Sequence, residues 1–596
     1  MHSDDVPRPE YPRPQFRRGD WECLNGWWQF EADPGDSGEP RGMVERELRG
    51  RIRVPFCPES ELSGIGDTDF CDAVWYRRAV TPPDTWVGRR LLLHFQAVDY
   101  DATVWVDGQE VARHRGGFTP FTCDLGVIDA PGQTRTVVVR ARDDHRPPQP
   151  RGKQSQRYEN YGCLYVRTTG IWQTVWMEPV PETRLHRPRL TPDVAAGTIR
   201  LDQGLAGPRA GLRLVATLSD GDGEVSRAEI PCDRDLTPHL ELPIPTGRRR
   251  LWGPGDPHLY QVRIELLDEA GRAVDQIDSY AGLRSVTIDG QAVLINGERV
   301  FQRLVLDQGY YPDGIMTAPS DEALRRDIEL SMRAGFNGAR LHQKVFEERF
   351  LTHADELGYL VWGEFGDWGT QNYGADDDHV HIPISQVAQW LEAVERDYSH
   401  PSIVGWCPLN ETNQVRTGRF TDLDDATLAL FLAAKAADGT RPVLDSSGYA
   451  HRVAESDIYD CHDYEQDPDR FAANQAGLAE GRPFQNQARM GAMSIAYGGQ
   501  PFFVSEFGGA RWSPQGGAEA WGYGDGPRTV EEWLDRFRRL CGTLLDDPRM
   551  FGYCYTQLTD VFQEQNGIYG FDRSGKFESK RLREAQVRTA AIERPD

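Results

Sequence analysis

Two glutamates each follow a short apolar run of the sequence. Glu411 comes after the run that begins at Ile403, and Glu506 ends the run that begins at Phe502. Both runs are typical of buried strands, and polar or glycine-rich chain follows each one directly. In α/β barrels, carboxylates at the ends of buried parallel strands lie on the catalytic face. Two carboxylates from different strands are what hydrolysis of a glycosidic bond requires, one as proton donor and one as base or nucleophile.

The second half of the chain alternates helical patterns with short apolar runs, as a parallel sheet with crossover helices does. One helix is predicted between Ser320, a good N-cap residue, and Gly335, a good helix terminator. Eight apolar runs fit between such helices: Val300–Val305, Asn337–Leu341, Leu360–Glu364, Ile403–Asn410, Pro442–Ser446, Ile458–His462, Phe502–Glu506 and Gly552–Gln557. The pattern predicts a (β/α)8 barrel in which Glu411 follows strand four and Glu506 follows strand seven.

The first half of the chain has alternating short strands and turn residues. Residues 24–178 include an Asp107-Gly108 turn between alternating runs, which predicts a β-hairpin within an all-β sandwich of the jelly-roll type. A second all-β stretch of about a hundred residues suits an immunoglobulin-like sandwich. We therefore expect three domains, at 1–182, 183–286 and 287–596. The polar stretch 146–160 is too long for a simple hairpin, and we expect it to reach a site elsewhere.

Composition narrows the class of protein. The 596 residues carry 67 basic and 92 acidic side chains, a net charge of −25, which disfavours nucleic acid and anionic membranes as partners. No stretch approaches the length of a membrane span, and the N-terminus lacks the pattern of a secretory signal. The ten cysteines show no pairing or metal-ligand spacing. We expect a cytoplasmic enzyme that forms a homo-oligomer, binds a small glycoside or an oligosaccharide end, and needs no cofactor or metal ion.

Further polar and aromatic side chains fall at the same strand ends, where a barrel gathers them into one pocket. The candidate substrate contacts are Asn410, Arg340, His342, Glu364, His462, Tyr464, Trp512, Gln557 and Asp560. Each has a structural alternative: a lone glutamate is commonly salt-bridged, and the two histidines could simply be hydrogen-bonded in the core. Trp406 is expected in or near the core. The run Asp376–Asp378 is expected to be a solvated loop, with metal binding as the alternative.

Several segments, taken in order, resemble glycoside hydrolase family 2, the β-galactosidase/β-glucuronidase family, across nearly the whole chain. They are Trp75–Arg78, Phe95–Tyr100, Arg115–Phe121, Thr168–Trp172, Gly335–Arg340, Asp355–Gly358, His400–Ile403, Asn410-Glu411 and Ser505–Gly508. The resemblance implies a retaining mechanism with Glu411 as acid/base and Glu506 as nucleophile. It also implies that Asn410 binds the sugar 2-hydroxyl. Physical chemistry agrees, since an ionised Glu506 nearby favours a protonated Glu411.

One departure from the family pattern bears on the substrate. The β-glucuronidases of the family carry an Asn-x-Lys motif that binds the substrate carboxylate, whereas the similar stretch here, Gln563–Ile568, has no lysine. A glucuronide would meet Glu564 where it needs a cation, which argues against that substrate. The expected activity is exo-hydrolysis of a β-galactoside or a furanoside (β-galactofuranose or α-L-arabinofuranose). A β-glucuronidase, a transglycosylase and an inactive carbohydrate-binding protein stay open as alternatives.

Overall fold

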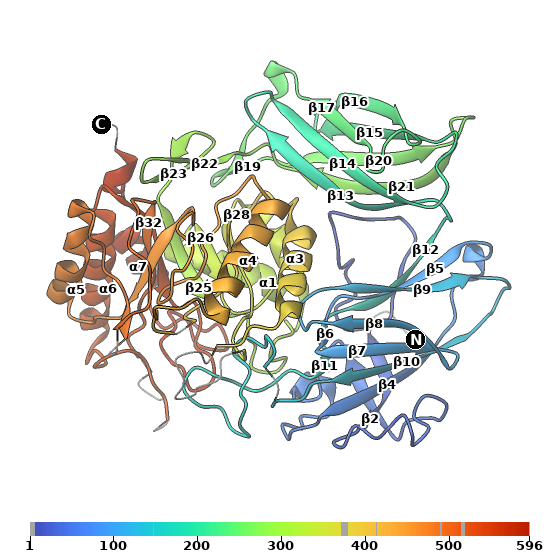
Figure 1. Cartoon of the computed structure of the whole chain (residues 1–596), viewed down its shortest axis with the longest axis horizontal. Helices are drawn as coiled ribbons and strands as arrows, with labels where there is room; N and C mark the ends of the chain where they lie inside the picture. Colours follow the sequence, from blue (N-terminus) through green and yellow to red (C-terminus); the bar gives the residue numbers. More distant parts are fainter. Residues whose placement is uncertain are drawn as a thin grey trace.

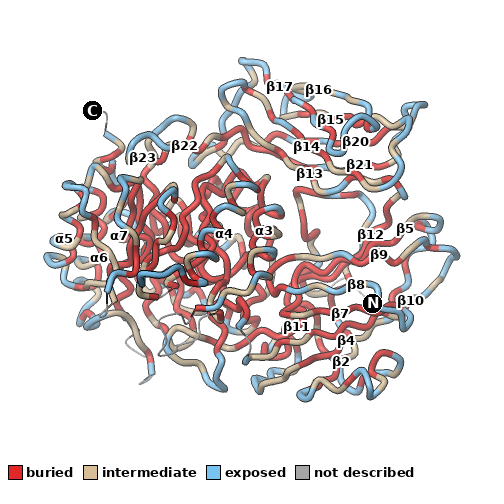
Figure 2. Tube along the Cα trace, in the orientation of Figure 1, coloured by how far each residue is buried: buried red, intermediate tan, exposed pale blue. Residues whose placement is uncertain are grey.

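The computed structural model describes residues 6–146, 148–370, 380–412, 414–488, 491–513 and 519–594. Figure 1 shows two β-rich parts at the right of the view and a part with helices around a parallel sheet at the left. Buried backbone is concentrated in the strands of the parallel sheet and in the interior of the β-rich parts (Figure 2). No helix in these ranges has the length and apolar character needed to cross a membrane.

The first β-rich part is a sandwich of two antiparallel sheets. One sheet has the order β1 (Glu22–Cys23), β12 (Val175–Val180), β5 (Arg90–Phe95), β9 (Phe121–Val127). The other has the order β3 (Gly50–Val54), β2 (Gly26–Ala32), β4 (Ala73–Val80), β10 (Arg135–Arg142), β7 (Asp101–Val106), β8 (Gln109–Arg115). The short strands β6 (Val98–Asp99) and β11 (Gly170–Ile171) pair with each other. Asp107 and Gly108 join β7 to β8 with φ of 50° and 80°, so the predicted Asp-Gly hairpin is confirmed.

The second β-rich part is also a sandwich. Its sheets have the orders β13 (Arg184–Asp193), β14 (Thr198–Ala206), β17 (His239–Pro243) and β16 (Gly223–Pro231), β15 (Arg213–Asp220), β20 (Tyr260–Leu267), β21 (Ala273–Ala281). Alternate residues such as Ile199, Leu214 and Ile264 face a common apolar core, as the period of two in a strand requires. The domain limits that we propose, 182/183 and 286/287, fall between β12 and β13 and at the start of β22 (Val286–Asp289).

The third part is built on a seven-stranded parallel sheet that curls into a barrel. Its order is β28 (Ile403–Cys407), β27 (Leu360–Glu364), β26 (Gly338–Leu341), β25 (Gln302–Asp307), β33 (Met550–Thr556), β32 (Phe502–Gly508), β29 (Tyr459–Asp463). A small sheet of β22, β23 (Ala292–Ile295) and β24 (Glu298–Arg299) precedes it, and β30 (Gln487–Ala488) pairs with β31 (Gly491–Ala492). The predicted combination of a jelly-roll, an immunoglobulin-like sandwich and a (β/α)8 barrel is confirmed.

One predicted barrel strand has a different form. The run 442–446 is not a regular strand, although it lies between the edge strands β28 and β29. Val443 makes a parallel bridge with Trp406 of β28, and its carbonyl accepts from the N–H of Asp457 just before β29. The reason is the buried carboxylate of Asp445, which accepts from the N–H groups of Ser446 and of residues 452 and 453. A side chain that binds backbone groups in this way competes with regular strand pairing.

Helices connect and cover the barrel strands. They are α1 (Asp321–Ala334), α2 (Glu348–Leu357), α3 (Ile384–Asp397), α4 (Asp422–Ala437), α5 (Pro468–Gln475), α6 (Val530–Leu545) and α7 (Ser579–Gln586). Short 3-10 turns lie at Glu61–Ser63, Asp84–Trp86, Thr246–Arg248, Ala476–Glu480 and Ala591–Glu593. Helix α1 begins and ends as predicted, because Ser320 accepts the N–H of Ala323 and Gly335 adopts a left-handed conformation with φ of 105°. All ten cysteines are free, and seven of them are buried.

Candidate active site

The polar residues at the strand ends come together on one face of the barrel. Arg340 lies in β26, Glu364 ends β27, and His462 and Glu506 lie near the ends of β29 and β32. Glu411 follows β28 by four residues, and its backbone N–H donates to the Ser447 carbonyl at 2.9 Å. The carboxyl ends of parallel strands point to the same side of a barrel, so the topology alone brings these side chains together.

Glu506 is a buried carboxylate held by several donors. Its Oε1 accepts from Arg340 Nη2 at 2.7 Å, and its Oε2 accepts from the Tyr464 hydroxyl at 2.5 Å. His462 Nδ1 lies 3.3 Å from the same Oε2. Burial opposes ionisation, but the charges of His462 and Arg340 outweigh it and lower the pKa of Glu506. Glu506 is therefore ionised at neutral pH.

Glu411 lies across the pocket from Glu506 and shares a histidine with it. His462 Nδ1 is 2.6 Å from Glu411 Oε1, and one ligand atom from each of Glu411, His462 and Glu506 lies within 4.8 Å of the others. Burial disfavours the imidazolium, but the charge of Glu506 and the bond to Glu411 raise the pKa of His462. Glu411 has a left-handed backbone, with φ of 49°, an uncommon conformation for a residue with a Cβ that is concentrated at functional sites.

Arg340 organises the polar floor of the pocket. Its fully buried guanidinium donates to Glu364 Oε2 at 2.6 Å, to the Ser505 carbonyl at 2.7 Å and to Asn410 Oδ1 at 2.6 Å. Because Oδ1 is engaged, the amide nitrogen of Asn410 points away from Arg340. That buried nitrogen has no hydrogen-bond partner among the described residues. An unpaired buried donor next to the carboxylate pair is suited to a ligand hydroxyl.

Glu364 and His342 support this floor. Glu364 Oε1 accepts the backbone N–H of Gln343 at 3.0 Å and lies 3.0 Å from His342 Nδ1. Burial, together with the nearby charges of Lys153 and Arg340, lowers the pKa of His342 well below its usual range. His342 is therefore neutral and acts only as a hydrogen-bonding group.

Three expected contacts are engaged elsewhere. Asp560 pairs with Lys576 at 2.6 Å, Trp512 lies against Phe577 with ring centroids 6.4 Å apart, and both ends of the Gln557 amide are hydrogen-bonded within the protein. Trp406 is 2% exposed, in the core as expected. The run Asp376–Asp378 lies outside the described residues.

The long polar stretch of the first domain reaches this site. The N–H of Arg151 donates to the Trp368 carbonyl at 2.8 Å, and the N–H of Gly152 donates to the Gly366 carbonyl at 3.1 Å. The next residue, Lys153, is 6% exposed and places its ammonium 4.6 Å from the Trp368 ring centroid. The indole of Trp368 in turn donates to the Asn410 carbonyl at 2.8 Å. The length of the stretch was the sequence signal for this reach, but no local pattern singles out Lys153.

Aromatic side chains form part of the wall. Tyr523 stacks on Tyr464 with ring centroids 3.4 Å apart and an interplanar angle of 7°, and Trp521 meets Tyr523 edge-on. Tyr449 lies edge-on to His462 at 5.8 Å. Tyr523 and Trp521 do not follow a predicted strand, so counting strand ends could not find them. Tyr449 follows the predicted run 442–446 by three residues and was missed.

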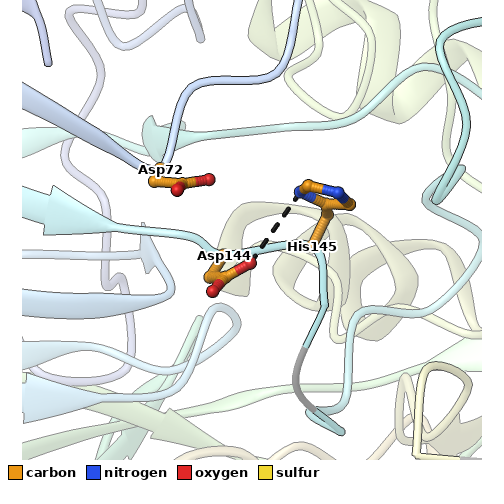
Figure 3. A group of neighbouring side chains, drawn as sticks. All are labelled: Asp72, Asp144 and His145. Carbon is orange, nitrogen blue, oxygen red and sulfur yellow. Dashed lines mark ion pairs between the residues drawn. The ribbon is translucent and has the colours of Figure 1, made fainter. Parts of the chain in front are cut away.

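Among the residues that the structure describes, two groups of side chains have the geometry for a metal ion. One is the Glu411, His462 and Glu506 group already described, in which the internal hydrogen bonds occupy the ligand atoms. The other is Asp72, Asp144 and His145 on the first domain, shown in Figure 3. Arg146 donates to both carboxylates at 2.8 Å, so a guanidinium already occupies the position of the cation. Neither group favours a resident metal ion.

Comparisons with known proteins agree with this architecture. Residues 67–145 match the profile for "Glycosyl hydrolases family 2, sugar binding domain", and residues 183–284 match "Glycosyl hydrolases family 2". The solved structure of a Ruminococcus gnavus β-glucuronidase superposes on this chain with a TM-score of 0.76 at 19% identity. The superposition covers 97% of this chain and 99% of the glucuronidase chain, so it includes the barrel. Two parts of the chain, residues 67–145 and 183–284, thus match domains of glycoside hydrolase family 2.

Relatives within family 2 carry more than one activity name. A β-glucuronidase of Paenibacillus borealis is 27% identical over 419 residues, which are 65% of this chain and 67% of that protein. "Beta-galactosidase 2" of Enterobacter cloacae is 25% identical over 475 residues, 72% of this chain and 43% of that protein. The chain thus spans between about two fifths and two thirds of these relatives, and the choice of sugar has to come from its own site.

Proposed function

We propose that the protein is an exo-acting retaining glycosidase that removes a terminal sugar by double displacement. The observation that carries this proposal is the clustering of Glu411, His462 and Glu506 atoms within 4.8 Å of one another. Retaining enzymes hold their two carboxyl groups about 5–5.5 Å apart, whereas inverting enzymes leave about 6.5–9.5 Å for a water molecule. The close spacing therefore supports direct attack by one carboxylate.

The two carboxylates have environments suited to different roles. Glu506 is ionised, held on both oxygens and nearly excluded from solvent, which suits a nucleophile at the anomeric carbon. Glu411 is more exposed, with 23% of its side chain accessible, and is hydrogen-bonded to His462, which suits a group that gives and later recovers a proton. The first step forms a bond between Glu506 and the sugar as the leaving oxygen takes a proton from Glu411. In the second step Glu411 removes a proton from water, which displaces Glu506.

Asn410 is suited to stabilise the transition state of both steps. Its free amide nitrogen is the donor that the sugar 2-hydroxyl requires, and such contacts strengthen as the oxocarbenium character develops. The names of the relatives favour a β-linked hexopyranoside as the substrate. The furanosides expected from the sequence have no support in these comparisons.

A covalent trap tests this proposal. We expect a 2-deoxy-2-fluoro glycoside with a good leaving group to label Glu506, with the mass increase located on the peptide that contains it. Proton NMR early in the hydrolysis of the matching natural glycoside should show the product with retained configuration. The Glu506→Gln variant, as the matched control, should remain unlabelled. Labelling at another residue, or an inverted first product, would contradict the assignment.

A further inference from the structure

Lys153 is a buried cation at the pocket whose charge the proposed mechanism does not use. Its side chain comes from the first domain, not from the barrel, and its ammonium lies over the Trp368 ring at 4.6 Å. No hydrogen bond or ion pair to that ammonium is found among the described residues. Burying a charge without a partner is costly, and Lys and Arg are rarely buried unless they are paired. A ligand that supplies the missing anion would account for this placement.

The backbone holds Lys153 firmly in this position. Its carbonyl accepts the N–H of Tyr165 at 2.8 Å, and the N–H of Gly152 before it donates to Gly366. Gly152 adopts φ of 61°, and a Cβ there would come within 2.1 Å of the Gln343 carbonyl oxygen. The backbone at Lys153 is thus packed directly against the loops after β26 and β27. These contacts fix the position from which the Lys153 side chain extends.

The charges around Lys153 keep it protonated. Burial opposes the ammonium, but the thiol of Cys163 and the carboxylates Glu564, Glu506 and Glu411 outweigh this and raise the pKa of Lys153. Lys153 therefore carries a positive charge when a ligand enters the pocket.

Glu564 does not have the role that the sequence suggested. Its Oε2 accepts from the Tyr165 hydroxyl, and its Oε1 accepts from Asn566 Nδ2 at 3.1 Å. Both oxygens are therefore engaged within the protein, and Lys153 supplies a positive charge close by. The objection to an acidic sugar was that a carboxylate would meet Glu564 with no cation near it. A lysine from another domain removes that objection.

We propose that Lys153 binds a carboxylate on the terminal sugar, so that the substrate class is a β-linked uronic acid. This inference rests on the proposed glycosidase function and deepens it. The cation that binds the sugar carboxylate would come from the jelly-roll domain and would take the place of a lysine on the barrel. The alternative is that the Lys153 ammonium only donates hydrogen bonds to the hydroxyls of a neutral sugar. The experiment distinguishes this role from carboxylate binding.

The experiment compares pairs of substrates that differ only at C6. The wild-type kcat/KM is measured on 4-nitrophenyl β-D-glucuronide and β-D-glucoside, and on the galacturonide and galactoside. We expect the uronide of at least one pair to be preferred. Lys153→Met should lower kcat/KM on that uronide by about 10²-fold or more, the scale for removing one partner of a buried charge pair, and should change the neutral substrate much less. Lys153→Arg should retain part of the preference.

Controls separate charge recognition from general damage. Lys580→Met removes a lysine that is 83% exposed on its side chain and should leave both rates unchanged. A 4-carboxyphenyl aglycone on a neutral sugar tests whether Lys153 instead reads a carboxylate on the leaving group, and a Lys153-dependent preference for it would overturn the inference. The wild-type comparison within each pair does not depend on how any variant folds.

The outcomes distinguish this inference from the proposed function. If Glu506 is labelled and neutral glycosides are hydrolysed while uronides are rejected, the inference is overturned and the glycosidase assignment stands. An equal loss by Lys153→Met on both members of a pair overturns it as well. If no glycoside is hydrolysed and Glu506 is not labelled, the proposed function itself fails, and the inference fails with it.

Discussion

Arg340 Nη2 lies 2.7 Å from Glu506 Oε1, and the two side chains are 0% and 5% exposed. The same guanidinium donates to Glu364 at 2.6 Å, so one cation pairs with two buried carboxylates. Burial of Arg340 opposes its charge, but Glu364 and Glu506 outweigh this and raise the pKa of Arg340 well above its usual range. The ionised state of the proposed nucleophile thus depends on a residue from a different strand.

Loss of this cation should affect both stability and pH dependence. We expect Arg340→Met to lower the free energy of unfolding by about 3–5 kcal/mol, because it leaves buried charges uncompensated. Glu506 has a lowered pKa, so its ionised form is lost as pH falls through that value; without Arg340 the loss should begin at higher pH. Urea denaturation and the acid limb of kcat/KM measure the two effects. Arg325→Met, which breaks the exposed pair with Glu329 on α1, is the control and should cost no more than about 1 kcal/mol.

Glu411→Ala should separate the acid step from the base step. Substrates with poor leaving groups need the proton, so we expect kcat/KM to fall by about 10²–10⁴-fold for them. Dinitrophenyl glycosides need no protonation, so their first step should be nearly unchanged while the second step becomes slow. Azide should restore turnover by replacing activated water, with a glycosyl azide of retained configuration as product. An equal loss on both classes of leaving group, without azide rescue, would refute the role of Glu411.

His462 connects the two carboxylates, and its charge should be visible in the pH profile. Its pKa is raised above the usual value, so the imidazolium is present at neutral pH and is lost as pH rises through the raised value. On the alkaline side, we therefore expect wild-type kcat/KM to begin its decline above about pH 6.5, the ordinary histidine value. His462→Asn keeps a donor near the position of Nδ1 but removes the charge. Its acid limb should shift to higher pH, because one of the cations that lower the pKa of Glu506 is gone. An unchanged acid limb would show that His462 is neutral in the working enzyme.

The local sequence patterns predicted the elements well and the directions of side chains less well. Ser320 and Gly335 mark the ends of α1, and apolar runs locate seven barrel strands, because capping and periodicity depend on neighbours in sequence. The run 442–446 looks equally apolar, but a buried Asp445 binds the backbone there. Counting strand ends predicts on which face of the barrel a residue lies, but not the direction of its side chain. Asp560 lies after a barrel strand as predicted, but its side chain pairs with Lys576. Lys153 depends on contact between domains, which no local pattern encodes.

Asn410 offers a test in which protein and substrate are altered together. Arg340 holds its Oδ1 and leaves Nδ2 without a partner, so the amide is oriented before the sugar binds. If that nitrogen donates to the 2-hydroxyl, Asn410→Ala and a 2-deoxy glycoside remove the same interaction from opposite sides. We expect each change alone to lower kcat/KM by about 10²-fold, on the scale of a donor acting in the transition state.

The combination of the two changes decides whether that contact exists. Asn410→Ala acting on the 2-deoxy substrate should lose little beyond either single change, since a shared interaction can be lost only once. Asn410→Asp, of nearly the same shape, replaces the donor with an acceptor and should be at least as impaired as Asn410→Ala on the natural sugar. Independent, multiplying losses would show that Asn410 acts elsewhere, for instance by holding Arg340 in place. In that case the thermal stability of Asn410→Ala should fall together with its activity.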